Sequence, residues 1–183
     1  MNIIKTDLSE VVIFEPRMFG DTRGFFFEHY QAERYAAYGV GPFVQDNLSR
    51  SSRGVVRGLH LQNPGSQGKL VSVTRGRVMD VAVDVRVGSP TFGKHVTVIL
   101  DDDKFRQVWI PRGFAHGFEV LSETADFFYK CDAPYSPADE IAIRWNDPAL
   151  KIAWRSAAPS LSGRDAAAPL LENVDRLPRY ERA

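Results

Sequence analysis

Residues 78–87 read Val-Met-Asp-Val-Ala-Val-Asp-Val-Arg-Val, and this stretch decides the fold class. Every second position from Met79 to Val87 is apolar, and the alternate positions carry Asp80, Asp84 and Arg86. An alternation with a period of two is the pattern of a β-strand that has one dry face and one polar face. The stretch therefore predicts a strand over residues 78–87.

Short stretches of the same kind surround this strand. They are rich in branched and aromatic residues, are separated by glycine and proline, and cover residues 11–14, 25–27, 69–74, 95–100, 107–110, 118–121, 127–131 and 141–145. Many short strands at this spacing predict an all-β sandwich or barrel. Short helices are expected at 31–38, which Gly39 closes, and at 166–173. We expect one domain over residues 1–183, with a barrel core at about 45–150 and a tail at 155–183 packed on it.

Composition narrows the class of function. The 23 basic and 23 acidic side chains give a net charge of zero, which disfavours a nucleic-acid partner. The single cysteine, Cys131, excludes an intramolecular disulfide and the cysteine-rich metal motifs. No stretch has the roughly 18 apolar residues of a membrane span, and the first residues lack the pattern of a signal peptide. We therefore expect a cytoplasmic protein without a membrane partner.

Two segments carry the residues suited to chemistry. The first reads Gly54-Val-Val-Arg-Gly-Leu-His-Leu-Gln62 and continues to Lys69 and Gly76, and the second reads Ile110-Pro-Arg-Gly-Phe-Ala-His-Gly117. Together they resemble the two motifs of the cupin superfamily, which implies a jelly-roll barrel. Metal-binding cupins use three histidines and a glutamate, but here Gln62 replaces one histidine and Lys69 the glutamate. This set is a poor metal site, because divalent transition metals need imidazole and carboxylate donors.

A closer resemblance is to the dTDP-4-dehydrorhamnose 3,5-epimerases, a cupin family that uses no metal, over about residues 3–172. It rests on several blocks in order, which are residues 21–28 (DTRGFFFE), 45–47 (QDN), 57–60 (RGLH), 67–71 (QGKLV), 89–93 (SPTFG), 110–117, 145–148 (WNDP) and 165–171 (DAAAPLL). The resemblance implies a homodimeric isomerase that epimerises a dTDP-linked 4-keto-6-deoxy sugar through enolate intermediates, without cofactor or metal.

The resemblance also implies roles for particular residues. His60 would be the base, Asp165 would orient its ring, Lys69 would face the enolate oxygen, and Tyr129 would be the acid on the opposite face. The residues implied to hold the nucleotide-sugar are Arg23, Glu28, Gln45, Asn47, Arg57, His116, Tyr135, Glu140 and Arg164. In the family the residue before the tail aspartate is often lysine, and here Arg164 keeps its charge. Glu28 and its neighbours are candidates for contact with the partner's site.

Structural interpretations of the same residues stay open at this point. Asp165 could simply cap the helix that follows it, because aspartate is a preferred N-cap. Tyr129 could fill the core, His116 could be a remnant of an ancestral metal site, and Asp80 or Asp84 could support His60 instead of Asp165. Alternative functions are a single-centre epimerase acting at C3 or C5 and a non-catalytic cupin that binds nucleotide-sugars. A metal-dependent cupin oxygenase is disfavoured by the lost ligands.

Overall fold

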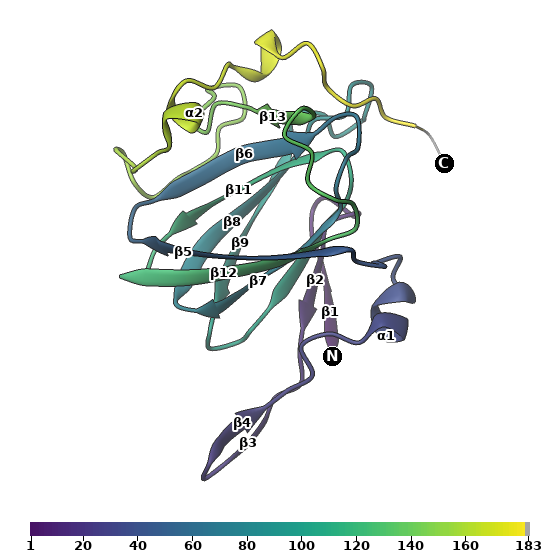
Figure 1. The fold of residues 1–183 in the computed structure, drawn as a ribbon, viewed down its shortest axis with the longest axis vertical. Coiled ribbons are helices and arrows are strands. Elements are labelled where there is room, and N and C mark those ends of the chain that lie inside the picture. Colours follow the sequence, from purple (N-terminus) through teal and green to yellow (C-terminus); the bar gives the residue numbers. More distant parts are fainter. Residues whose placement is uncertain (182–183) are drawn as a thin grey trace.

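Two antiparallel sheets form the body of the protein in the computed structural model, which describes residues 1–181. The first sheet has the order β1 (Asn2–Lys5), β2 (Val12–Glu15), β10 (Gln107–Ile110), β7 (Lys69–Arg75), β12 (Thr124–Cys131) and β5 (Gln45–Ser52). The second has the order β13 (Glu140–Ala142), β6 (Val56–Gln62), β11 (Phe114–Val120), β8 (Arg77–Asp84) and β9 (His95–Asp101). Sequence neighbours are often apart in these orders, as in a jelly roll (Figure 1). The prediction of an all-β barrel is confirmed.

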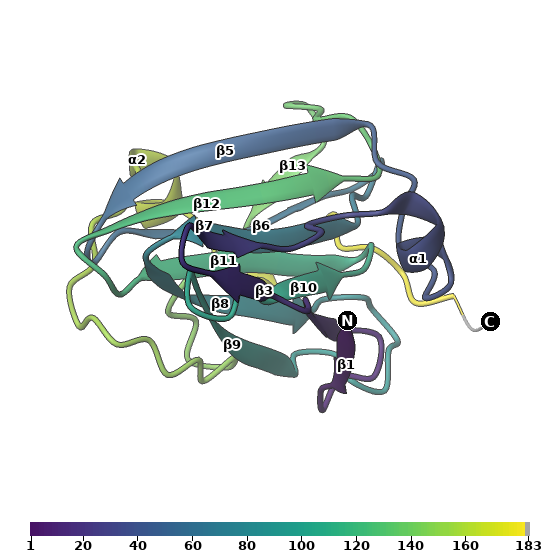
Figure 2. The same cartoon turned by 90° about the horizontal axis from the view of Figure 1, so that it is seen from below.

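The main core lies between the two sheets, which face each other in Figure 2. Val71 and Phe127 of the first sheet pack there against Ala82 and Phe118 of the second. The predicted dry face of residues 78–87 does not belong to this core. Met79, Val81 and Val83 point to the outside of the second sheet and form a separate cluster with the C-terminal tail.

The tail therefore covers one outer face of the barrel. Apolar residues of the tail and of the segment before it pack on the second sheet, and they are Leu150, Ile152, Trp154, Leu171, Val174 and Leu177. The predicted strand over 78–87 ends earlier, at Asp84, and the chain then turns into the connection to β9. In Figure 1 the tail, drawn in yellow, lies beside β13 and β6 on the side away from the first sheet.

The helices are shorter than predicted. The first, α1 (Ala32–Ala36), begins after Gln31, whose side chain accepts a hydrogen bond from the Arg34 backbone. The predicted helix over 166–173 is wrong. The tail instead has a four-residue helix, α2 (Gly163–Ala166), and a 3-10 turn, Leu171–Asn173. Pro169 lies between them and cannot continue a helix, because it lacks the N–H donor and its ring clashes with the preceding turn. Within residues 1–181, no helix is long and apolar enough to cross a membrane.

A small hairpin projects from the barrel. It consists of β3 (Phe19–Asp21) and β4 (Gly24–Phe26), and it stands apart from both sheets in Figure 1. Phe25 and Phe26 are 57% and 70% exposed at its surface. We call residues 17–28 the arm.

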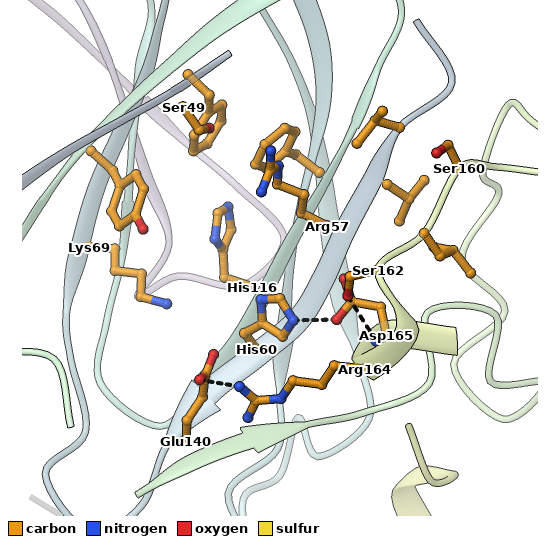
Figure 3. Close-up of a pocket in the computed structure, with 16 residues that line it drawn as sticks. Ser49, Arg57, His60, Lys69, His116, Glu140, Ser160, Ser162, Arg164 and Asp165 are labelled. Atoms are coloured by element: carbon orange, nitrogen blue, oxygen red, sulfur yellow. Dashed lines mark hydrogen bonds and ion pairs between the residues drawn. The ribbon is translucent and has the colours of Figure 1, made fainter. Parts of the chain in front are cut away.

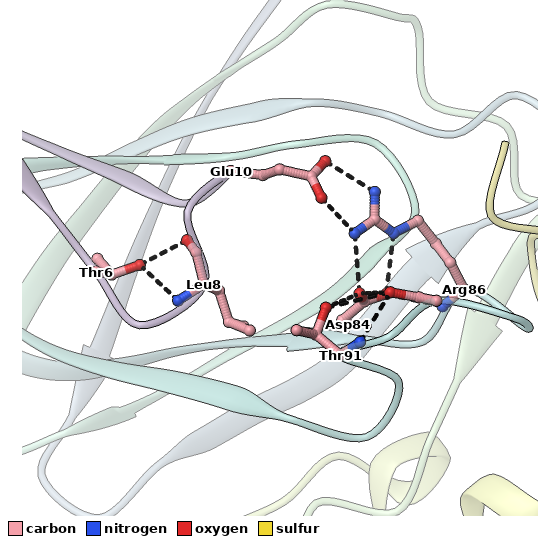
Figure 4. Close-up of polar contacts among 7 residues, drawn as sticks. Thr6, Leu8, Glu10, Asp84, Arg86 and Thr91 are labelled. Atoms are coloured by element: carbon pink, nitrogen blue, oxygen red, sulfur yellow. Dashed lines mark hydrogen bonds and ion pairs between the residues drawn. The ribbon is translucent and has the colours of Figure 1, made fainter. Parts of the chain in front are cut away.

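A buried ion-pair network joins Glu10 to the segment that follows β8 (Figure 4). Asp84 is fully buried and accepts hydrogen bonds from the Arg86 side chain at 2.9 Å and from Ser89 and Thr91. Arg86 reaches on to both carboxylate oxygens of Glu10, at 2.7 and 2.8 Å. Burial by itself raises the pKa of Asp84, but these hydrogen bonds outweigh it and bring the pKa down to about 2. The network thus ties the N-terminal segment to the connection between β8 and β9.

Replacing Arg86 by leucine is expected to destabilise the fold by about 3–5 kcal/mol, because the ionised Asp84 would stay buried without its partner. Urea unfolding measures this loss. The control is Arg77→Leu, which removes a half-exposed guanidinium from a surface pair and should change the free energy of unfolding by less than about 1 kcal/mol. Equal effects of the two variants would show that the network does not stabilise the fold.

Candidate active site

The interior of the barrel holds a cavity of about 410 Å³, a size typical of small-ligand sites. A second hollow of about 330 Å³ adjoins it, and His60, Lys69, Tyr129 and Glu140 line both. The main cavity lies between the sheets and is bounded on one side by the tail. These four residues therefore stand at the junction of one elongated site.

His60 lies on β6 and is 28% exposed to the cavity. Its Nε2 is 2.6 Å from Oδ1 of Asp165, which is almost completely buried. Burial by itself raises the pKa of Asp165, but hydrogen bonds from His60, Ser162 and the Gly58 backbone outweigh it, so the pKa is lowered. Because Asp165 is ionised, Nε2 donates to it and Nδ1 remains as the proton acceptor of the ring. This arrangement suits a general base.

Asp165 does not cap α2. The N-cap is Ser162, whose hydroxyl accepts from the Asp165 backbone N–H at 3.1 Å. Because Ser162 caps the helix, the Asp165 carboxylate can point away from α2 and contact His60. The other two aspartates considered for this role have different partners, since Asp80 contacts His116 at 2.7 Å and Asp84 binds Arg86.

A close approach of two strands places His60. Gly58 has a φ of +124°, and a Cβ there would come within 2.6 Å of the Gly117 backbone on β11. The pairing of β6 with β11 shifts register at this point, between His116 and Phe118. Two glycines let the strands approach where side chains could not fit. His60 and His116 consequently lie opposite each other on neighbouring strands.

Lys69 and Tyr129 enter the cavity from the other sheet. Tyr129 on β12 pairs with Val71 on β7, two residues beyond Lys69, so the two functional side chains share one face. Burial raises the pKa of the Tyr129 phenol and lowers the pKa of the Lys69 ammonium. In Figure 3, Asp165 lies on one side of the His60 ring and Lys69 on the other. Tyr129 also packs against the main core, so it fills space and lines the cavity at once.

The lowered pKa of Lys69 gives the reaction an expected alkaline limit. The resemblance predicts that Lys69 faces an enolate oxygen, a role that requires its positive charge. We therefore expect the rate to fall as pH rises through the pKa of Lys69, which lies below the usual value of about 10.4. Tyr129 would lose its proton later, because its pKa is raised. Lys69→Arg keeps the cation to much higher pH, so the fall of kcat/KM should move to higher pH. If kcat/KM falls at the same alkaline pH in the wild-type protein and in Lys69→Arg, the fall must be assigned to a group other than Lys69.

Further residues of the expected set surround the junction. Arg57 and His116 line the main cavity, and Gln45, Asn47 and Tyr135 line the second hollow. Glu140 accepts hydrogen bonds from Tyr135 at 2.5 Å and from Arg164. These bonds and the Arg164 charge outweigh the opposing effect of burial and lower the pKa of Glu140.

Arg23 and Glu28 lie elsewhere. The Arg23 side chain is 87% exposed in the arm and pairs with Asp21, while Glu28 contacts Arg34 at 3.3 Å. Neither lines the cavity of its own chain.

Gln62 stands where metal-binding cupins carry a histidine, and here it has a structural task. Its amide oxygen accepts from the Ser136 backbone, and its amide nitrogen donates to the carbonyls of Gly65 and Pro134. In the described part of the chain, no three or more His, Cys, Asp and Glu side chains gather as a potential metal site.

Several cavity residues escaped the sequence analysis. Ser49 follows Gln45 and Asn47 with a period of two on β5, a signal that could have identified it. The others carried no usable pattern, and they are Val55, Val56, Phe118, Phe127, Ser160, Leu161 and Ser162.

The jelly roll with this internal cavity defines a cupin-type protein, and comparison with known proteins identifies its family. The sequence model of dTDP-4-dehydrorhamnose 3,5-epimerase matches residues 5–173. The chain belongs to the dTDP-4-dehydrorhamnose 3,5-epimerase family, which is a family of isomerases.

Three similar proteins illustrate this membership. The chain is 52% identical to the dTDP-4-dehydrorhamnose 3,5-epimerase of Salmonella typhimurium, over 95% of this chain and 97% of that one. It is 51% identical to the enzyme of the same name from Pseudomonas aeruginosa, over 97% and 100%. The crystal structure of dTDP-6-deoxy-D-glucose-3,5-epimerase from Legionella pneumophila in complex with dTDP-4-keto-L-rhamnose superposes with a TM-score of 0.96, at 55% identity over 99% of both chains.

Proposed function

We propose that this protein is an isomerase that converts dTDP-4-dehydro-6-deoxy-D-glucose into dTDP-4-dehydro-L-rhamnose, in the biosynthesis of dTDP-L-rhamnose. One observation carries the proposal. An imidazole on the second sheet, paired with a carboxylate from the tail, faces a phenol and an ammonium on the first sheet across a single cavity. Family membership and the ligand of the Legionella structure support the nucleotide-sugar as substrate.

The chemistry follows from the position of the ketone. A 4-keto group acidifies the hydrogens on C3 and C5, so a base can remove either and leave an enolate. Nδ1 of His60 takes the proton, and Lys69 stabilises the charge on the enolate oxygen. Tyr129 then returns a proton to the same carbon from the opposite wall, which inverts the centre. Each inversion transfers one proton in and one out, and no electron changes hands.

The test is incubation with the 4-keto nucleotide-sugar in heavy water, followed by NMR of the product. Deuterium at both C3 and C5 of an L-configured sugar is the expected result. Label and inversion at only one carbon would make the protein a single-centre epimerase. Binding without any exchange would make it a non-catalytic nucleotide-sugar-binding protein.

We also propose that the protein is a homodimer in which the arm of one subunit completes the site of the other. The exposed Phe25 and Phe26 suit burial in an interface, and Arg23 suits the diphosphate, because its planar guanidinium matches phosphate oxygens. Neither Arg23 nor Glu28 reaches its own cavity.

Mixing two inactive variants tests the shared site. Co-expressed His60→Asn and Arg23→Ala chains should regain activity, because a mixed dimer contains one site with both residues intact. Light scattering measures the size of the assembly. A monomer, or a mixture as inactive as its components, would contradict the exchange of arms.

A further inference from the structure

The carboxylate that orients His60 is carried by a segment with little structure of its own. Residues 155–171, which we call the strap, are the first part of the tail. They line one side of the cavity at Ser160–Asp165 and contain the four-residue α2. A helix this short is unstable in isolation, because the free-energy cost of ordering its first turn exceeds the stabilisation from that turn's hydrogen bonds. The 2.6 Å contact between Asp165 and His60 therefore depends on what holds the strap.

Glu119 holds the first end. This residue on β11 is only 2% exposed, and its carboxylate points out of the sheet toward the strap. Oε2 accepts from the Arg155 backbone N–H at 2.7 Å, and Oε1 accepts from the Ser156 N–H at 2.8 Å. Within residues 1–181 no salt bridge involves Glu119. A buried carboxylate needs hydrogen-bond donors, and here two main-chain N–H groups supply them.

Asp147 holds the second end in the same way. It is 4% exposed, and its Oδ2 accepts from the Leu171 N–H at 2.7 Å. Its Oδ1 accepts from the Ala149 N–H at 2.8 Å, which fixes the carboxylate itself. Between the two ends the strap makes further main-chain hydrogen bonds to the barrel. The Ser160 N–H donates to the Gly54 carbonyl, the Val56 N–H donates to the Ser160 carbonyl, and the Arg144 N–H donates to the Pro169 carbonyl.

We infer that Glu119 and Asp147 are positioning residues of the reaction, which act through the strap to hold Asp165 against His60. The inference rests on the proposed function. The hydrogen bond between His60 and Asp165 would lengthen if the strap moved. A shift of 1 Å at a reacting group can lower the rate about 10²-fold. Neither carboxylate lines the cavity, so neither acts on the substrate directly.

The sharpest test uses amide variants of the same shape. Glu119→Gln and Asp147→Asn each replace one acceptor oxygen by an NH₂ group. An NH₂ group cannot accept a hydrogen bond from a main-chain N–H, so each variant loses one of the bonds that hold the strap. We expect kcat to fall about 10-fold in each, with KM changed less than about 2-fold. In an Asp165→Asn background the same changes should have almost no further effect, because the contact they protect is already lost.

A control variant separates positioning from general stability. Asp84→Asn also removes a buried carboxylate that accepts a main-chain N–H, at 3.0 Å from Arg86, but it touches neither the strap nor the cavity. It should lower the free energy of unfolding and leave kcat within about 2-fold at temperatures where the protein stays folded. If Glu119→Gln lowers kcat by the same factor in the wild-type and in the Asp165→Asn background, the inference is overturned. A wild-type kcat in folded Glu119→Gln and folded Asp147→Asn would also overturn it. If Glu119→Gln does not fold, Asp147→Asn decides alone.

A spectroscopic measurement keeps the inference independent of catalysis. The proton between Nε2 of His60 and Asp165 should give a downfield proton NMR signal, identified by its loss in His60→Asn and Asp165→Asn. This signal should broaden or vanish in Glu119→Gln, and stay in Asp84→Asn. An unchanged signal in Glu119→Gln would refute the positioning role, whether or not the protein turns over the proposed substrate. Failure of the wild-type protein to turn over that substrate would refute only the proposed function.

Discussion

Replacing His60 by asparagine is expected to abolish deuterium uptake at C3 and at C5 together. The His60 imidazole stands at the junction of the cavity with Nε2 bonded to Asp165. In the proposed mechanism Nδ1 of His60 takes the proton and Asp165 stabilises the imidazolium cation that forms. General bases of this kind contribute about 10²–10⁴-fold, so the rate should fall at least 10²-fold. Asparagine fits the space and can still donate to Asp165, so the fold should be kept. NMR in heavy water measures exchange at each carbon separately.

The matched comparison is Asp165→Asn, which keeps the base and weakens its orientation. Its loss of rate should be smaller than that of His60→Asn and equal at both carbons, because an orienting carboxylate modulates a base without being one. Retained exchange at one carbon in His60→Asn would show that another group serves that centre. His116, opposite His60 and paired with Asp80, would be the first to examine.

Tyr129→Phe is expected to separate exchange from inversion. Burial raises the pKa of this phenol above its usual value of about 10, so it is a proton donor at neutral pH. Without the hydroxyl, His60 can still remove a proton and return a solvent deuteron on the same face, which labels the substrate but inverts nothing. The variant should therefore wash deuterium into the substrate and form little L-configured product, a loss of about 10²-fold or more in epimerisation.

Tyr135→Phe provides the comparison for this change. Its hydroxyl donates to Glu140 at the edge of the second hollow, so its loss should affect KM more than inversion. Inversion at the normal rate in Tyr129→Phe would make Tyr135 the next candidate for the acid. If exchange and inversion disappear together in a folded Tyr129→Phe protein, the phenol acts before proton return.

Short-range patterns in the sequence predicted much of the fold and the reacting groups. Alternation identified the central strands, and motif spacing brought His60, Lys69 and His116 together because each lies on a strand of the same barrel. Strand β5 was missed as a strand, because alternate residues of Gln45–Ser52 face solvent and the polar cavity, which removes the apolar alternation. Which face of residues 78–87 lies inside could not be predicted either, since the answer depends on the tail that covers the other face.

The long-range contacts needed more than local pattern. Asp165 is 105 residues from His60, and only the family resemblance connected them before the structure did. Glu119 and Asp147 were not identified at all as site residues. Their partners are main-chain N–H groups, which every residue except proline possesses, so no side-chain pattern in the sequence marks such a contact.

The strap has a consequence for the order in which the protein is made. During synthesis the barrel strands, which end at Ala142, leave the ribosome before Asp165 does, and domains fold as they emerge. A chain interrupted between them lacks the carboxylate beside His60 and also leaves the outer faces of Met79, Val81 and Val83 bare. Incomplete chains therefore lack the Asp165 carboxylate and also expose apolar surface. Chaperones and proteases can recognise these defective chains by that exposed surface. The strap, which follows the barrel strands in the chain, thus completes the site and covers apolar surface in the same step.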